Sequence, residues 1–265
     1  MKYVIITPAR NEGNHIEQTI HSVIHQTHPP AEWVIVDDGS NDNTGEIADR
    51  YANQTQWIRV IHRPDRGFRK AAGGVIESFY AGYQTLRCAD WDFVVKMDAD
   101  LTFDPDYFEK CLIHFKNNPS LGIGGGAVYR PEGDQFVLDD DHPLFHVRGA
   151  TKIYKRECWE AIGGLIQQPG WDTLDEIKAN MLGWETLTFA ELKLIHLKFT
   201  GSADGTWPNL VKNGRSDYII GYHPLFMLLK CVKRIFEKPY VLGSLGLLYG
   251  FASGYLYAIP QVDDK

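Results

Sequence analysis

Residues 33–44 read WVIVDDGSNDNT, an apolar run of four residues that ends in two aspartates and a glycine. The length of the run is typical of a buried strand, and the polar residues behind it are good N-caps for a helix predicted over Asn43–Tyr51. A strand without charged residues, followed by a loop and a helix, indicates a parallel sheet that helices cover on both faces. This stretch therefore predicts an α/β fold.

The segments on both sides repeat this alternation of strand and helix. Further strands are predicted at Tyr3–Thr7, Trp57–Ile61 and Phe93–Met97, and further helices at Asn14–Gln26 and Lys70–Leu86. We expect residues 1–100 to form a Rossmann-like nucleotide-binding half in a mixed, mainly parallel sheet. Behind this half, residues 174–182 are predicted to be helical up to Gly183, and Leu192–Phe199 alternates like a strand.

The composition limits the classes of protein to which the chain can belong. Its 265 residues correspond to one or two domains, and a hydrophobic content of 44% excludes a disordered chain. The net charge of -7 disfavours binding to nucleic acid, which needs clustered Lys and Arg. Four cysteines without a CxxC pair are expected to be reduced thiols, and the N-terminus lacks the pattern of a signal peptide. We therefore expect a cytoplasmic protein.

Polar residues follow three of the predicted strands: Pro8–Glu12, Asp37–Ser40 and Asp98–Asp100. Ligands bind at this edge of an open α/β sheet. No GxGxxG or GxxxxGK[ST] stretch follows the first strand, so a dinucleotide-binding dehydrogenase and a P-loop NTPase are disfavoured. Asp98 and Asp100 can instead hold Mg²⁺ or Mn²⁺ beside substrate phosphates. Each of the three stretches alone could also be a turn or a helix cap.

In the order of these motifs, the chain resembles the family 2 inverting glycosyltransferases of GT-A fold. The resemblance rests on TPARNEG at residues 7–13, VIVDDGSNDNT at 34–44 and FVVKMDADLTFDPDYF at 93–108, and it covers roughly residues 1–200.

The resemblance implies roles for particular residues of this sequence. The nucleobase and ribose pocket would be lined by Pro8, Ala9, Glu12 and Asp38. Asp98 and Asp100 would bind the metal, with Asp100 the more direct ligand, and Asp98 would also belong to the nucleotide site. Arg66, Arg69 and Lys70 would lie near the donor phosphates; a solvated loop and helix start is the alternative for these three.

The family pattern also implies a catalytic base about a dozen residues before a glycine that ends a helix. Asp172 lies 11 residues before Gly183 and matches that position, although Trp171 stands where the family has Glu. Inversion in a single displacement needs a carboxylate that accepts the proton of the attacking hydroxyl. Asp175 and Glu176 are the alternative bases, and Asp172 could instead only cap the helix.

His196 lies on the predicted strand behind this helix, where the family sometimes places a histidine near the metal or the diphosphate. A histidine with a purely structural role is the alternative. The chain has no QxxRW stretch, so the resemblance argues against a processive polysaccharide synthase.

The resemblance thus implies a hexosyltransferase-like enzyme that uses Mn²⁺ or Mg²⁺ and a nucleotide-sugar donor. The acceptor would be a saccharide or a lipid-linked molecule in cell-envelope glycan or glycolipid synthesis. One alternative is a sugar-nucleotide pyrophosphorylase, but TPARNEG lacks the Gly-rich phosphate loop that such an enzyme needs. The other is a non-catalytic scaffold, which would have no use for Asp172.

Residues 223–265 are expected to form a helical tail behind a glycosyltransferase domain of residues 1–222, in which residues 101–222 form the acceptor half. Pro224–Lys238 is amphipathic with four basic residues, and Pro239–Pro260 carries no charge over 22 residues. Its glycines at four-residue spacing suit close helix packing. We expect the tail to contact the inner face of a membrane peripherally, or to form a homodimer.

Overall fold

The structure, a computed structural model, describes residues 1–67, 73–133, 135–139, 142–198, 205–237 and 239–263. The chain forms two compact units. The sheet unit consists of Met1–Gln167 and Asp172–Lys198, and the helical unit of Gln168–Trp171 and Phe199–Lys265. Two of the basic residues expected near the donor phosphates, Arg69 and Lys70, lie outside the described residues.

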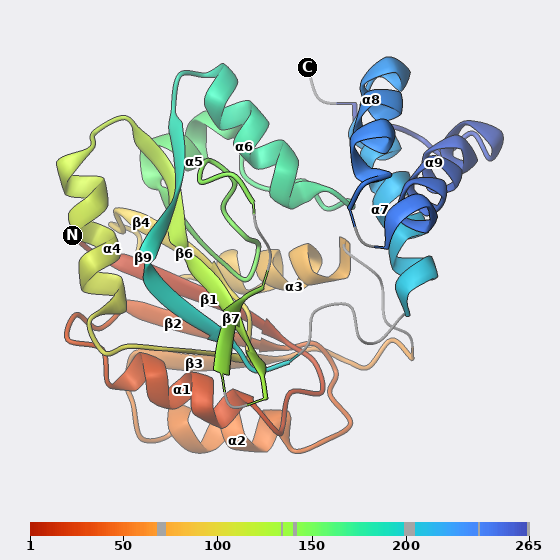
Figure 1. Cartoon of the computed structure of the whole chain (residues 1–265). Helices are drawn as coiled ribbons and strands as arrows, with labels where there is room; N and C mark the ends of the chain where they lie inside the picture. The colour runs from red at the N-terminus through yellow and green to blue at the C-terminus, as the bar shows by residue number, and fades with distance from the viewer. Residues whose placement is uncertain (68–72, 134, 140–141, 199–204, 238, 264–265) are drawn as a thin grey trace. The chain divides into compact units, whose positions relative to one another are not determined.

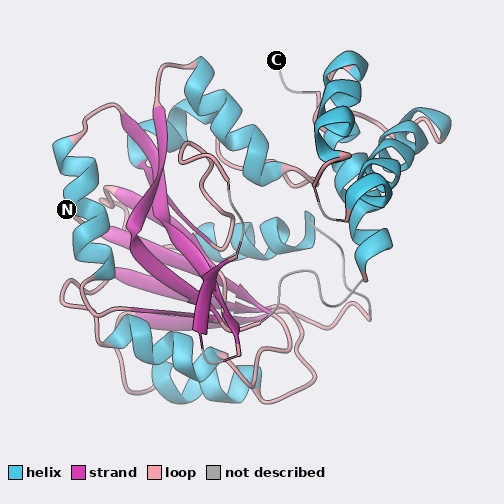
Figure 2. Cartoon of the chain, viewed as in Figure 1, coloured by secondary structure: helices cyan, strands magenta, loops and turns pink. Residues whose placement is uncertain are grey.

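The sheet unit is built around a mixed sheet, which Figure 2 shows in magenta. Its strands are β1 (Tyr3–Ala9), β2 (Glu32–Asp37), β3 (Ile58–His62), β4 (Phe93–Met97), β5 (Leu101–Phe103), β6 (Leu121–Glu132), β7 (Gln135–Leu138), β8 (Thr151–Lys155) and β9 (Glu185–His196). Their order is β3-β2-β1-β4-β8-β6-β9-β5, with β7 paired to β6. The predicted mixed α/β sheet is confirmed. Strands β1 to β4 pair in parallel with one another, as do β6 and β9, whereas β8, β7 and β5 pair antiparallel to their neighbours, so the sheet is not mainly parallel.

The parallel half forms where the sequence predicts it, because its strands are apolar and buried on both faces. Every residue of β2 and β4 is buried. Helices α1 (Ile16–Ile24) and α2 (Thr44–Ala52) cover one face of these strands, and α3 (Gly73–Tyr83) covers the other (Figure 1). The buried residues of α1 recur at the spacing of one helix face.

The other helices of the sheet unit are α4 (Tyr107–Asn117), α5 (Arg156–Ile162) and α6 (Trp171–Met181). Helix α6 begins three residues before its predicted start, so Asp172 lies in its first turn. Strand β9 begins at Glu185 and not at the predicted Leu192. The sequence pattern misses the first part of the strand, because an irregularity in its pairing with β6 interrupts the alternation of buried and exposed side chains. The alternation of apolar and polar residues that indicates a strand is therefore visible in the sequence only after the irregularity.

The helical unit contains α7 (Thr206–Ile219), α8 (Pro224–Arg234) and α9 (Tyr240–Leu256). It begins before the predicted boundary at residue 223, because α7 packs closely on α9. At Gly250 an added Cβ would lie 2.1 Å from the carbonyl oxygen of Val211, so only glycine allows this approach of the two backbones. Among the described residues, no helix combines the length and the apolar character needed to cross a membrane.

Candidate functional site

Hydrogen bonds tie the loops behind β1 and β2 to each other. The amide of Asp38 donates to the carbonyl of Ala9 over 2.8 Å, and the amide of Glu12 donates to Thr44 Oγ1 over 2.8 Å. Between them Asn11 has a positive φ of 55°, which Asn tolerates better than most residues. The loop behind β1, which follows Pro8 and Ala9 at the end of the strand, is therefore fixed beside Asp38.

Arginines surround the Asp38 carboxylate. Arg63 Nη1 lies 2.6 Å from Oδ1, and Arg66 pairs with Oδ2. Arg10 donates to the carbonyl oxygen of Asp38 over 2.6 Å. Arg66 also pairs with Glu77 over 3.0 Å, so its guanidinium contacts two carboxylates. The structure thus places Arg66 at the expected nucleobase pocket.

The Asp98–Asp100 turn meets His196 because β5 pairs with β9. Leu101 lies opposite His196 in this antiparallel register, and His196 Nε2 lies 3.1 Å from Asp100 Oδ2. Asp98, Asp100 and His196 each offer a ligand atom, and the three atoms lie within 4.8 Å of one another. Two carboxylate oxygens and an imidazole nitrogen are a donor set that suits Mn²⁺. The residues therefore fit the expected divalent cation.

The charges of this group are only partly balanced. Burial raises the pKa of Asp98 and the charge of Asp100 adds to this, while the nearby Lys96 ammonium opposes both. Burial lowers the pKa of His196, but the hydrogen bond and the charge of Asp100 outweigh burial and raise it above its usual value. Two carboxylates that are desolvated side by side favour a cation between them.

Glu12 supplies a further acceptor near this group. Its Oε1 pairs with Lys198 Nζ over 2.8 Å, while its buried Oε2 has no hydrogen-bond partner among the described residues. Burial raises the pKa of Glu12; Lys198 opposes the rise, and Asp100 and Asp98 add to it. A buried oxygen without a partner is costly, so it is available to a donor from a ligand.

Two buried lysines link the group of Asp98, Asp100 and His196 to α6. Lys96 on β4 and Lys152 on β8 are register partners, so their side chains lie on the same face of the sheet. Lys96 pairs with Asp98, and Lys152 Nζ donates to the carbonyl oxygen of Asp172 over 2.6 Å. The first turn of α6 is therefore held to the strand that lies next to β4.

The other two carboxylates of α6 are engaged in the interior. Lys152 Nζ lies 3.0 Å from both oxygens of Asp175 and 2.8 Å from Glu176 Oε1. Tyr154 donates to Asp175 over 2.6 Å, and His146 Nδ1 lies 2.8 Å from Glu176 Oε2. Burial raises the pKa of Asp175 against the opposing charge of Lys152. For Glu176, Lys152 and His146 outweigh burial and hold the pKa below its usual value.

The carboxylate of Asp172 is not held by neighbouring side chains in the way that those of Asp175 and Glu176 are. It is partly exposed, and its carboxylate has no hydrogen bond or ion pair with any residue that the structure describes. Asp175 and Glu176 serve to anchor the helix, whereas Asp172 is available to a ligand. Of the three acidic residues considered from the sequence, Asp172 is the one whose carboxylate forms no hydrogen bond with a described side chain.

A cavity of about 110 Å³ lies in the sheet unit beside this helix. Tyr129, His142, His146 and Thr188 are among the residues that line it, together with aliphatic side chains. His146 joins the cavity wall to α6 through its contact with Glu176. The lining is mainly apolar, with a few hydroxyl and imidazole groups.

We expect Lys152→Met to destabilise the sheet unit by about 3–5 kcal/mol, because it leaves two buried carboxylates without their shared cation. The free energy of unfolding in urea measures the loss. Lys110→Met is the matched control, because it removes a solvent-exposed ion pair with Asp106 and should leave the unfolding curve almost unchanged. Equal losses in the two variants would show that the buried lysine does not hold the network.

Four basic residues of the site did not emerge from the sequence motifs: Arg63, Lys96, Lys152 and Lys198. Lys96 and Lys152 carry a usable signal, since each is a charged residue inside a short buried strand and therefore needs a buried partner. Arg63 and Lys198 follow the ends of β3 and β9, and only the position at the sheet edge distinguishes them from solvated residues.

The fold and the site together define a class of protein: α/β proteins with a mixed sheet and a carboxylate-rich edge behind its parallel strands. Comparison with known proteins names the family. Residues 4–168 match the model of glycosyl transferase family 2, and the chain belongs to this family. The predicted family and fold are thereby confirmed, and the family membership disfavours the pyrophosphorylase alternative.

Relatives of known name support the same family. The chain is 33% identical over 137 residues to TuaG of Bacillus subtilis, a teichuronic acid biosynthesis glycosyltransferase of provisional assignment; the match covers 50% of this chain and 51% of TuaG. It is 30% identical over 116 residues to the poly-beta-1,6-N-acetyl-D-glucosamine synthase of Staphylococcus aureus, covering 44% of this chain and 26% of the synthase. The match thus spans about half or less of the length of these relatives.

A solved structure supports the fold. The mannosyltransferase PcManGT from Pyrobaculum calidifontis, in complex with GDP-Man and Mn²⁺, superposes with a TM-score of 0.64 at 16% identity. The superposition covers 97% of this chain and 88% of that protein. The likeness establishes a common fold.

Proposed function

We propose that the chain is a metal-dependent inverting glycosyltransferase that moves a hexose from a nucleotide-sugar donor to an acceptor hydroxyl. The observation that carries this proposal is the grouping of Asp98, Asp100 and His196 behind β4, near the buried free oxygen of Glu12. A nucleotide-sugar donor would suit both features, because its phosphates would be neutralised by a cation that the three residues could hold, and a ribose hydroxyl could donate to Glu12 Oε2.

The donor would be held mainly by the loops behind β1 and β2. Pro8 and Ala9 offer the base a rigid backbone edge, and Glu12 Oε2 can accept a hydrogen bond from a ribose hydroxyl. Asp38, fixed by Arg63 and Arg66, presents an oriented carboxylate to the base. That PcManGT was solved with GDP-Man and Mn²⁺ supports a donor of this class and a divalent cation.

The residues fit a divalent cation on Asp98, Asp100 and His196, which when bound would neutralise the charge that develops on the departing nucleoside diphosphate. The ion pair with Lys96 orients the Asp98 carboxylate, and the contact with Asp100 orients the imidazole of His196.

Asp172 would act as the base. As the acceptor oxygen attacks the anomeric carbon, its proton passes to the Asp172 carboxylate, while the bond from the anomeric carbon to the diphosphate breaks on the opposite side. Lys152 holds the backbone of Asp172 in place and leaves its carboxylate free. A single displacement of this kind inverts the anomeric configuration.

The acceptor is proposed to be a saccharide or a lipid-linked molecule of the cell envelope. The relatives from Bacillus and Staphylococcus, named for teichuronic acid biosynthesis and for a polysaccharide synthase, support this context. The cavity beside α6, with its hydroxyl and imidazole groups, is a suitable place for a sugar hydroxyl group.

A donor screen tests the proposal. Release of nucleoside diphosphate is measured from a panel of nucleotide sugars with Mn²⁺, with Mg²⁺ or with a chelator. We expect at least one donor to be hydrolysed slowly, only with a divalent cation, and faster when an acceptor is added. Binding of a donor without turnover under every condition would favour a scaffold instead.

A further inference from the structure

The last helix of the chain carries its large apolar side chains on the outside. On α9 the residues Val241, Leu242, Leu245, Leu248, Tyr249 and Leu256 are between 41% and 77% exposed. At 100° per residue these positions fall on one side of the helix. No charged residue lies on α9. A helix that borders water normally presents charged and polar residues on this side.

The inner side of α9 is formed by small residues. Added Cβ atoms at Gly246 and Gly254 would lie 2.7 Å and 2.1 Å from side-chain atoms of Leu210 and Tyr218 on α7. The backbones of α7 and α9 therefore approach closely, with the bulk of the side chains turned outward. Small residues inside and large apolar residues outside are the pattern of helices packed in lipid.

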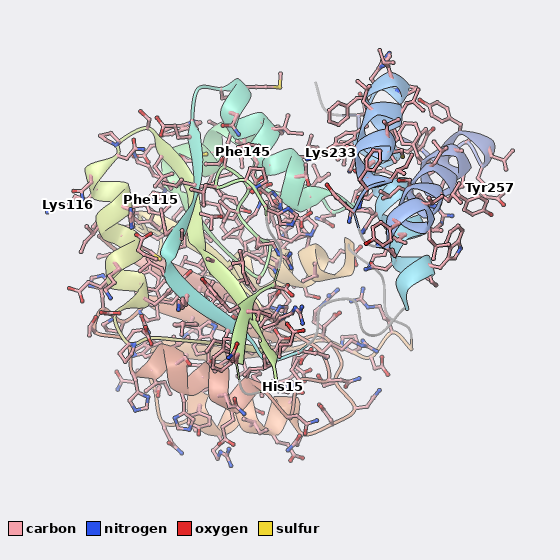
Figure 3. All side chains as sticks on the ribbon, viewed as in Figure 1. His15, Phe115, Lys116, Phe145, Lys233 and Tyr257 are labelled. Atoms are coloured by element: carbon pink, nitrogen blue, oxygen red, sulfur yellow. The ribbon has the colours of Figure 1, made fainter. Side chains whose placement is uncertain are left out.

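Helix α8 repeats the outward apolar face. Leu225, Leu228, Leu229 and Val232, at the spacing i, i+3, i+4 and i+7, form one stripe and are between 49% and 60% exposed. Its inward face is formed by Met227 and Cys231. Figure 3 shows side chains projecting from both helices, with Lys233 on α8 and Tyr257 behind α9 labelled. Rows of exposed large apolar side chains on two successive helices are unusual in a chain surrounded by water.

The charge of the helical segment complements an anionic surface. Residues 206–256 contain six Lys and Arg but only two Asp and Glu, a net charge of +4 in a chain of -7. One of the two acids, Asp217, is paired with Lys230 over 2.7 Å. Lys233 is exposed beside the apolar stripe of α8. Long basic side chains can reach lipid headgroups while their apolar neighbours enter the layer below.

We propose that the outward faces of α8 and α9 are a docking surface for an anionic lipid bilayer. One side of α9 packs on α7, so the helices lie in the interface with the other side in the apolar layer. This inference uses the helical unit alone and does not depend on the proposed transfer reaction. It suits an acceptor that is itself carried on lipid.

Flotation with vesicles tests the docking surface. The full chain is mixed with vesicles of phosphatidylcholine, alone or with one third phosphatidylglycerol, and the bound fraction is measured at low and high salt. We expect binding to the anionic vesicles that weakens, without vanishing, at high salt, because apolar burial persists when charges are screened. The double variant Leu229→Glu/Leu245→Glu should reduce binding by about tenfold or more, since it puts charges into the apolar layer.

The matched control is Ile113→Glu, which puts the same charge on an apolar residue of α4 that is 47% exposed in the sheet unit. It should bind vesicles like the unaltered chain. Unchanged binding in the double variant, or no binding by the unaltered chain, would overturn the proposal. A dimer that forms without lipid and that the double variant dissociates would also overturn it, because a second copy would then cover the face. A lower melting temperature of the double variant would do the same, because the apolar face would then be packed within the folded chain.

Discussion

Asp100→Asn is expected to reduce nucleoside-diphosphate release by more than about a hundredfold, the usual scale for removing a preorganised electrostatic contact in an active site. The amide offers a neutral oxygen in place of a carboxylate, and His196 loses the anion that orients it. Donor affinity measured with Mn²⁺ should fall as well, because a cation that Asp98 and Asp100 would hold could no longer neutralise the donor phosphates. Asp98→Asn is expected to act in the same direction, and it also removes the carboxylate that pairs with buried Lys96.

The matched control is Asp90→Asn, which makes the same chemical change in an exposed pair with Lys2 and should leave activity unchanged. A titration of Mn²⁺ against the Asp100 variant separates weaker metal binding from slower chemistry. Full activity of the unaltered enzyme in excess chelator would contradict the role assigned to the cation.

The parallel half of the sheet could be predicted because its information is local. Strands such as β2 and β4 are apolar runs buried on both faces, and each is followed by a loop with recognisable turn residues. The antiparallel strands carry a different signal. In β6 an added Cβ at Gly125 would lie 2.6 Å from the carbonyl oxygen of Thr151 on β8, so its glycines reflect a close approach of strands and not a flexible loop.

Strand β8 illustrates what the sequence conceals. Lys152 stands in the middle of a five-residue strand and is fully buried, which local patterns disfavour. Its burial is possible only because Asp175 and Glu176 bring two carboxylates from α6. The two carboxylates lie more than twenty residues further along the chain, so no short window of sequence contains both the lysine and its acidic partners.

The candidate site divides in the same way. Asp98 and Asp100 belong to one short motif at the end of a predictable strand, and their proximity follows from the motif itself. His196 joins them only through the pairing of β5 with β9, where Leu101 lies opposite it. The roles of α6 residues depend on which carboxylates are engaged by Lys152, and the identical charges of Asp172 and Asp175 give no sign of this difference in the sequence.

Asp172→Asn is expected to lower the rate of sugar transfer by about a hundredfold or more while donor affinity stays unchanged, as befits the loss of a general base. The amide is nearly the same size, and no hydrogen bond joins the Asp172 carboxylate to another described residue, so α6 should remain folded with its Lys152 contacts intact. The rate is measured with saturating donor and acceptor, and donor affinity is measured separately by calorimetry.

Asp175→Asn and Glu176→Gln distinguish a base from an anchor within the same helix. Because both carboxylates are buried against Lys152, these variants should lower the free energy of unfolding, and any loss of transfer should follow that loss of stability. Asp172→Asn should do the reverse, with an unchanged unfolding curve and little transfer. If Asp172→Asn transfers normally while Asp175→Asn is folded and inactive, the base lies one helical turn further along α6, and the network around Lys152 serves to tune that carboxylate.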